Sequence, residues 1–145
     1  MRFFISCLVL STSVFISPLY ASPMKGVDNP AYTQTLYLMH CQGCHLPKGQ
    51  GAAGRVPNML GYLGNFLKVP GGREFLIQVP GSANAPVDNQ DLAQLLNWML
   101  AKFSPKLLDK DWQAFTVDEI NKHRAGVLKE VIEHRLTLVN KIKRL

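Results

Sequence analysis

An all-α fold with a C-terminal helical extension is predicted by the spacing of apolar residues along this 145-residue chain. The clearest helix covers residues 88–103, where apolar side chains recur at the helical period and Asp88 is a suitable N-cap. A first helix begins at Asn29-Pro30, an N-cap followed by proline, and a third helical pattern covers residues 116–142. The length allows one domain plus an appendage.

The remaining elements follow from local signals. Apolar residues at spacings of four and three over 32–39 give the first helix one apolar face. Residues 48–55 are rich in glycine and predict a loop, whereas 60–67 and 72–79 each have room for a short helix. The pattern therefore predicts several helices separated by Gly- and Pro-rich segments.

The N-terminus has the pattern of a secretory signal peptide. Arg2 precedes an uncharged apolar run at residues 3–16, and the segment that ends at Ala21 is a suitable cleavage region. We predict a signal peptide at residues 1–21, a mature chain in the bacterial periplasm, and no membrane span after cleavage. An uncleaved membrane anchor is the alternative.

Residues 104–145 form the predicted extension. From residue 101 onward there are ten Lys or Arg against six Asp or Glu, whereas residues 22–100 are nearly neutral. Thr116 and Glu119 predict a capping box, and an apolar stripe then runs to Ile142 beneath many basic side chains. The helix either folds back on its own domain or docks to an acidic partner. Nucleic acid is disfavoured, because the chain has an export signal and no nucleic-acid motif.

Cys41-Gln42-Gly43-Cys44-His45 is the most informative motif. Cys-x-x-Cys-His is the attachment sequence of c-type haem, in which two thiols reach neighbouring vinyl groups and the His binds iron. A zinc half-site is disfavoured because a Cys-type zinc site needs about four ligands. A dithiol redox centre is disfavoured because no βαβ pattern surrounds the pair. We predict one covalent haem c on Cys41 and Cys44, with His45 as an axial iron ligand.

The order helix, haem motif, Gly-rich loop, Pro-Asn segment and closing helix resembles class I cytochrome c over about residues 30–103. The segment that begins at Pro57, Pro-Asn-Met-Leu-Gly-Tyr-Leu-Gly, is similar to the family's Pro-Asn-Leu-His-Gly-Leu-Phe-Gly stretch. The resemblance implies a cytochrome c-like helical domain around the haem. It also implies that the Pro57 carbonyl accepts a hydrogen bond from His45, and that Tyr37 and Trp98 meet where the domain's first and last helices cross.

The chain departs from the family on the other face of the haem. Class I cytochromes usually supply a distal Met from the loop before the last helix, and the family patterns put Asn84 or Ala85 there. Met59 and Met99 are weak candidates for the sixth ligand, because each fits the apolar core better. An open or water-filled site is a further possibility. Weaker candidates near the mature N-terminus and on the tail helix, where the two histidines would share a face, are Met24, His123 and His134.

Three functions follow from a single attached haem. The first is a periplasmic one-electron carrier between a donor and an acceptor protein. The second is an open-site haem protein that binds NO, CO, O₂ or peroxide, and the third is a haem subunit of a dehydrogenase complex. Catalysis would need a distal acid–base residue, but the loop offers only Asn84 and small residues, and the sequence gives no position for Arg55 or Arg73. We therefore predict a non-enzymatic electron carrier.

Overall fold

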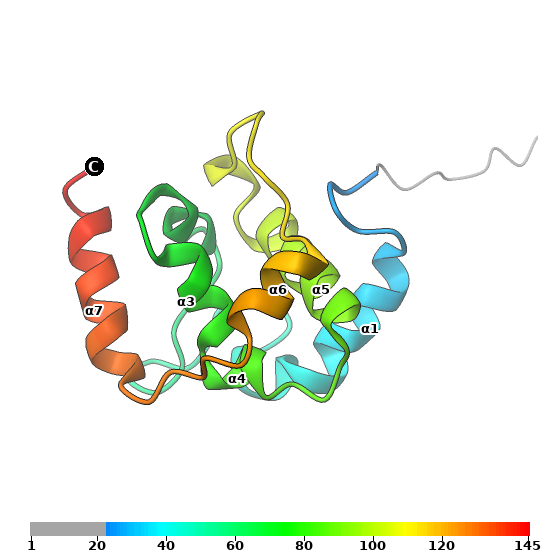
Figure 1. Ribbon diagram of the computed structural model, residues 1–145, viewed down its shortest axis with the longest axis horizontal. Helices are drawn as coiled ribbons and strands as arrows, with labels where there is room; N and C mark the ends of the chain where they lie inside the picture. The colour runs from blue at the N-terminus through cyan, green and yellow to red at the C-terminus, as the bar shows by residue number, and fades with distance from the viewer. Residues whose placement is uncertain (1–22) are drawn as a thin grey trace, which may run out of the picture.

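The computed structural model describes residues 23–145, which fold into helices joined by loops without any strand (Figure 1). The all-α prediction is confirmed, and the predicted signal peptide lies outside the described residues. Within this part of the chain, no helix has the length and apolar character needed to cross a membrane. The elements in chain order are α1 (Pro30–His40), α2 (Gln42–His45), η1 (Leu63–Lys68), α3 (Gly72–Gln78), α4 (Pro80–Ala83), α5 (Asn89–Phe103), η2 (Pro105–Leu107), α6 (Val117–His123) and α7 (Val131–Ile142).

Helices α1 and α5 begin where the sequence predicts. The Asn29 side chain accepts a hydrogen bond from the Tyr32 amide at 3.0 Å, and Asp88 accepts one from the Asp91 amide at 2.8 Å. Each cap satisfies a backbone donor that has no partner within its own helix. The predicted loop at 48–55 is also confirmed, and the short helix expected at 60–67 forms as the 3-10 helix η1.

Tyr37 lies where α1 crosses α5, and only 1% of its surface is exposed. Its ring centroid is 5.3 Å from that of Trp98 and 5.2 Å from that of Phe103. Aromatic pairs at these separations add to the stability gained from burial alone. The implied meeting of Tyr37 and Trp98 is therefore confirmed.

The tail forms two helices, so the prediction of one continuous helical stripe is wrong. Residues 124–130 leave the helical path, and the Leu128 amide in this linker donates to the Gln78 carbonyl at the end of α3 (3.0 Å). His123 and His134 consequently lie on different helices and do not share a face.

The predicted capping box of α6 forms only in part. The Thr116 hydroxyl accepts from the Glu119 amide at 3.2 Å, as predicted. The Glu119 carboxylate pairs instead with Arg73, whose Nε and Nη2 donate to it at 2.7 and 2.6 Å. A guanidinium offers two parallel charge-assisted hydrogen bonds, which a single backbone amide does not.

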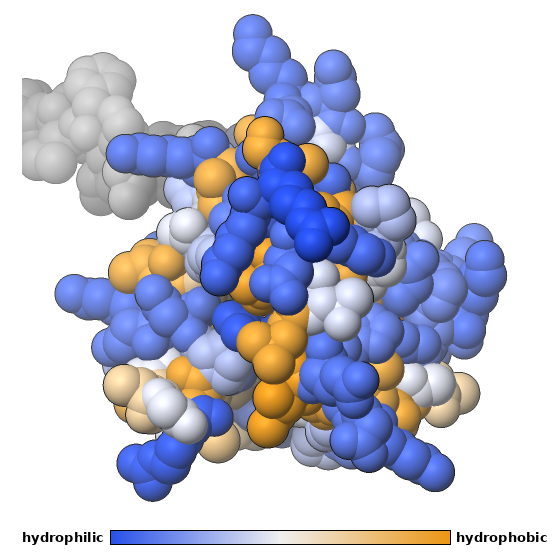
Figure 2. Space-filling model, turned by 90° about the vertical axis from the view of Figure 1, so that its left-hand side faces the viewer, coloured by the Kyte–Doolittle hydropathy of each residue, from blue (hydrophilic) through white to orange (hydrophobic). Residues whose placement is uncertain are grey.

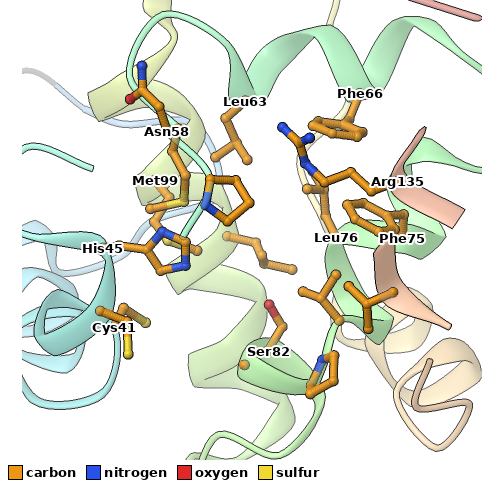
Figure 3. Close-up of a pocket in the computed structure, with 18 of the residues that line it drawn as sticks. Cys41, His45, Asn58, Leu63, Phe66, Phe75, Leu76, Ser82, Met99 and Arg135 are labelled. Atoms are coloured by element: carbon orange, nitrogen blue, oxygen red, sulfur yellow. The ribbon is translucent and has the colours of Figure 1, made fainter. Parts of the chain in front are cut away.

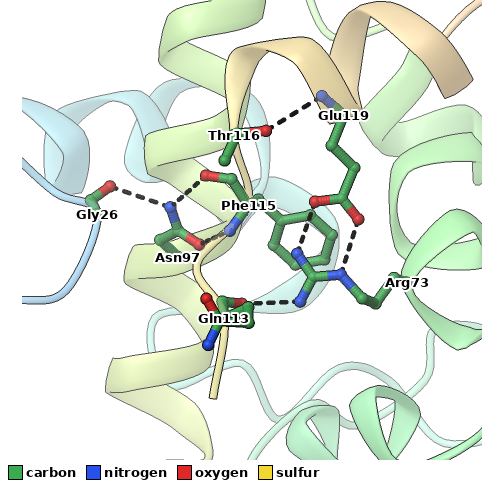
Figure 4. Close-up of polar contacts among 7 residues, drawn as sticks. All are labelled: Gly26, Arg73, Asn97, Gln113, Phe115, Thr116 and Glu119. Atoms are coloured by element: carbon green, nitrogen blue, oxygen red, sulfur yellow. Dashed lines mark hydrogen bonds and ion pairs between the residues drawn. The ribbon is translucent and has the colours of Figure 1, made fainter. Parts of the chain in front are cut away.

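The tail shares its core with the preceding domain, because Phe115, Ile120 and Leu138 belong to the same buried apolar cluster as α5. Asn97 of α5 is fully buried and connects the N-terminal segment to the tail (Figure 4). Its Nδ2 donates to the carbonyls of Gly26 and Phe115, both at 3.0 Å, and its Oδ1 accepts from the Phe115 amide at 2.7 Å. The tail therefore folds back on its own domain, while the boundary at residues 103/104 stays a prediction.

Candidate functional site

The cysteine motif lies at the junction of α1 and α2. Cys41 caps the end of α1: its amide donates a hydrogen bond to the Tyr37 carbonyl (2.9 Å). The Cys41 carbonyl in turn accepts a hydrogen bond from the His45 amide (2.9 Å). The Tyr37 hydroxyl donates to the Leu46 carbonyl at 2.6 Å and fixes the end of the motif. The backbone of this segment is thus one tight turn with both thiols and the imidazole on it.

These three side chains face a cavity of about 320 Å³ (Figure 3). Its walls come from the cysteine motif, the Pro57 segment, η1, α3, α4, α5 and α7, and they are mainly apolar. This composition suits a large apolar ligand held by a few polar groups. The apolar and aromatic lining residues are Pro57, Met59, Tyr62, Leu63, Phe66, Phe75, Leu76, Val79, Pro80, Leu96, Met99 and Val131.

Burial lowers the pKa of His45, because removal from water disfavours the charged imidazolium, and the Pro57 carbonyl acts in the opposite direction. The neutral imidazole is the form that binds a metal ion. Among residues 23–145, the His45 Nδ1 is the one fully buried side-chain nitrogen or oxygen without a hydrogen-bond partner. A hydrogen bond of normal geometry to the Pro57 carbonyl therefore stays a prediction, although Pro57 lines the same cavity.

The two thiols differ in environment. Burial, with a smaller effect of Cys44, raises the pKa of Cys41 to about 11, whereas Cys44 is exposed at the cavity rim. Dithiol redox centres depend on a thiol with a lowered pKa, so this environment does not favour one. No cluster of three or more His, Cys, Asp or Glu side chains among residues 23–145 could hold a metal ion, and this finding gives no support to a zinc site.

The wall away from His45 contains α4 rather than a methionine-bearing loop. Ser82 lines the cavity, and its hydroxyl is directed into it in Figure 3. Asn84 is exposed and Ala85 is buried, and neither lines the cavity. The two residues that the family patterns align with the distal Met therefore lie outside the cavity in this chain.

The two candidate methionines both line the cavity and are nearly buried. Met99 comes from α5 and lines the cavity together with His45. The remaining candidates from the sequence do not line the cavity: Met24, Arg55, Arg73, His123 and His134. Arg73 is instead paired with Glu119 and lies 4.1 Å from the centroid of the Phe115 ring.

Helix α7 completes the cavity through Val131 and Arg135, which no local sequence motif marked as site residues. One signal was present, because Arg135 interrupts the apolar stripe that Val131, Leu138 and Ile142 form on the inner face of this helix. A charged residue at such a position indicates a polar partner inside the protein.

The loop after α4 is held by Arg124, which lies in the linker between α6 and α7. Its guanidinium donates to the carbonyls of Ala83, Val87 and Ala85 at 3.0, 2.9 and 2.6 Å, and to the Asn89 side chain at 2.6 Å. The tail thus fixes one wall of the cavity as well as supplying part of it.

No protein-family model matches the chain. Two curated proteins are similar to it, and both are named Cytochrome c-552, one from Thermus thermophilus and one from a particular strain of that species. Each is 30% identical over 118 aligned residues, which cover 68% of this chain. The alignments cover 90% and 80% of the two relatives, so the similarity extends over most of their length.

Proposed function

Because the chain belongs to the class I monohaem c-type cytochromes, we propose that it is an exported electron carrier between redox proteins of the bacterial periplasm. Members of this family carry covalently bound haem c, and this chain carries one. When bound, the haem supplies an iron that gains or loses a single electron. The predicted signal peptide at residues 1–21 supports export.

We assign covalent attachment to Cys41 and Cys44 and one axial iron position to His45. The assignment is supported by their position at one end of a single apolar cavity. It is supported further by the burial that lowers the pKa of His45 and so favours the neutral imidazole, the form that binds a metal ion. The Pro57 backbone acts on the pKa of His45, and Pro57 lines the same cavity.

The observation that carries the carrier proposal is an exposed rim on an otherwise apolar cavity. Cys44 is open to solvent, so a porphyrin edge attached there would be within reach of a docked partner. Among the lining residues, the titratable groups other than tyrosine are His40, Cys41, Cys44, His45 and Arg135. Four of these belong to the cysteine end, and an arginine keeps its proton at all ordinary pH values. No general acid–base pair for substrate chemistry therefore faces His45.

A redox titration of the holoprotein tests this proposal. We expect one electron per chain and rapid reoxidation of the reduced protein by a small acidic redox protein, with a rate that falls as ionic strength rises. Sustained peroxide turnover, without electron exchange with protein partners, would contradict a carrier. Stable copurification with a larger dehydrogenase would instead support the role of a haem subunit.

We propose the outer surface of α7 as a docking surface for an acidic redox protein. Ile132 and Leu136 are 78% and 53% exposed, and Figure 2 shows apolar residues running down this side of the molecule between hydrophilic ones. Exposed basic side chains on or near the helix outnumber its exposed acidic residues, Glu130 and Glu133, and give the surface positive charge: Lys129, Lys141, Lys143 and Arg144. Replacing Lys129 and Lys143 by Glu should slow electron exchange severalfold at low salt, whereas Lys110→Glu, at an exposed position outside both this helix and the cysteine motif, should change it less.

One observation favours a second function, an open-site haem protein that binds a small ligand. Asn84 and Ala85 do not line the cavity, and Ser82 is the residue of that wall with a side-chain hydroxyl in it. Absorption spectra of the reduced holoprotein with and without CO separate the two functions. Rapid, complete CO uptake at physiological pH would favour ligand binding, and an unchanged spectrum would favour the carrier.

A further inference from the structure

Arg135 is the one Arg, Lys, Asp or Glu residue among those that line the cavity. Its side chain is half-buried, and Figure 3 shows its guanidinium pointing into the cavity near Leu63 and Phe66. It makes no ion pair and donates no side-chain hydrogen bond to any residue in the range 23–145. A charged group against an apolar wall is costly unless a partner satisfies it.

Helix α7 is fixed firmly enough to hold Arg135 in this position. The Leu128 amide, just before the helix, donates to the Gln78 carbonyl at 3.0 Å. Leu138, one turn after Arg135, is only 1% exposed, and the His134 ring stacks on Phe75 with centroids 5.9 Å apart and an interplanar angle of 9°. The packing of α7 therefore fixes the backbone of Arg135 against the cavity.

No carboxylate from residues 23–145 lines the cavity, so a carboxylate that pairs with Arg135 there would arrive with a ligand. A haem carries two carboxylates on the porphyrin edge opposite the edge whose vinyl groups form thioethers. In Figure 3, Cys41 and the Arg135 guanidinium lie on opposite sides of the cavity. A porphyrin attached at the cysteines would thus direct its carboxylates toward the side where Arg135 lies.

We propose that Arg135 binds a haem carboxylate, so that the C-terminal extension forms part of the cofactor site. The inference rests on the haem site of the proposed function and does not depend on which proteins exchange electrons with it. The planar guanidinium matches a carboxylate through two parallel hydrogen bonds. Its positive charge also favours the reduced iron, which carries one positive charge fewer than the oxidised iron.

The test compares Arg135→Gln with Arg144→Gln in the full-length holoprotein. Arg144 is exposed beyond the end of α7, so its replacement removes the same formal charge without touching the cavity. We expect the midpoint potential to shift downward in R135Q, to shift less in R135K, and to stay near the unmodified value in R144Q. Equal potentials in R135Q and R144Q would overturn the proposal.

A free anion could present the same carboxylate chemistry, and a formate titration at constant ionic strength separates the two sources. A haem carboxylate predicts a potential and spectrum that do not respond to formate in the unmodified protein. A saturable formate response that R135Q abolishes would assign Arg135 to an exogenous anion and overturn the haem-carboxylate assignment.

A crystal structure of the unmodified holoprotein decides the question if R135Q fails to fold or mature. A guanidinium nitrogen within about 3 Å of a haem carboxylate oxygen supports the proposal, and a guanidinium turned into solvent overturns it. Haem staining after denaturing electrophoresis distinguishes failure of the haem site from failure of the role proposed for Arg135. Loss of covalent haem from the unmodified protein would contradict the haem site itself, whereas intact haem with an unchanged R135Q potential would contradict only the role of Arg135.

Discussion

The two walls of the cavity are built in different ways. The cysteine wall, residues 37–46, is one contiguous segment whose geometry comes from backbone hydrogen bonds within α1 and α2 and from the Tyr37 hydroxyl. The tail wall consists of residues 75–82 together with Val131 and Arg135, and it depends on contacts between segments far apart in the chain. Arg124 is central to it, because it bonds the tail to the loop after α4.

This difference suggests that one wall attaches the haem and the other sets its redox potential. The thiols and the imidazole are presented by a turn whose backbone hydrogen bonds are local, so we expect haem attachment to depend little on the tail. The opposite wall can change its residues without disturbing that turn, and it holds the cavity residues that lie away from His45. Axial ligation and nearby charge are the main protein controls on haem potential, so we expect the tail wall to set the potential of this cytochrome.

The largest expected effect is on the cysteine wall. Replacing Cys41 and Cys44 together by Ser removes both thioether-forming sulfurs, and we expect complete loss of covalent haem. Expression with a cytochrome c maturation system, followed by haem staining after denaturing electrophoresis, measures this loss. A haem stain as strong as that of the unmodified protein would show that attachment occurs elsewhere.

The second prediction concerns the sixth iron position on the tail wall. Ser82 faces the cavity, so Ser82→Met should bring a thioether into it, whereas Asn84→Met and Ala85→Met should not. We expect only S82M to gain the far-red band of thioether-ligated oxidised haem and a raised potential. A band in A85M alone would restore the family register. A strong band in the unmodified protein that disappears in Met59→Ala or Met99→Ala would identify a relocated sulfur ligand.

The third prediction tests how the tail wall is held. Arg124→Met removes four hydrogen bonds to the segment 83–89, and we expect the free energy of unfolding to fall by about 2–3 kcal/mol, as for lost charged hydrogen bonds. Lys122→Met, an equivalent change at an exposed position of α6, should have little effect. Urea unfolding of the holoprotein measures both. Equal stabilities would show that the loop is held without Arg124.

The cysteine wall could be predicted from the sequence and the tail wall could not, for a physical reason. Asn29, Asp88 and the Cys-x-x-Cys-His motif act through neighbours within a few residues, so their spacing specifies the local structure. Arg124 and Arg135 act on segments far away in the chain. Their roles depend on the break between α6 and α7, which the continuous apolar stripe concealed. Asn97 was hidden for the same reason, because its three partners belong to the N-terminal segment and the tail.

The smallest expected effect concerns Tyr37, whose hydroxyl joins α1 to the end of the cysteine motif. Tyr37→Phe removes its hydrogen bond to the Leu46 carbonyl while keeping the ring packed on Trp98, and we expect a loss of about 1 kcal/mol near neutral pH.

The stability that the Tyr37 hydroxyl contributes should also depend on pH. Burial raises the pKa of Tyr37 to about 12 in the folded protein, against 10.0 for an ordinary tyrosine. Between these values the unfolded chain has released the phenol proton and the folded chain has not, so stability falls as pH rises through this window. Tyr37→Phe lacks this contribution, so the advantage of the unmodified protein should shrink from about pH 10 upward and disappear before about pH 12. Urea unfolding of both proteins at about pH 9 and about pH 11, on either side of the ordinary tyrosine pKa, measures the change. A stability difference that stays constant over this range would show that the Tyr37 hydroxyl does not control the alkaline stability of the cysteine wall.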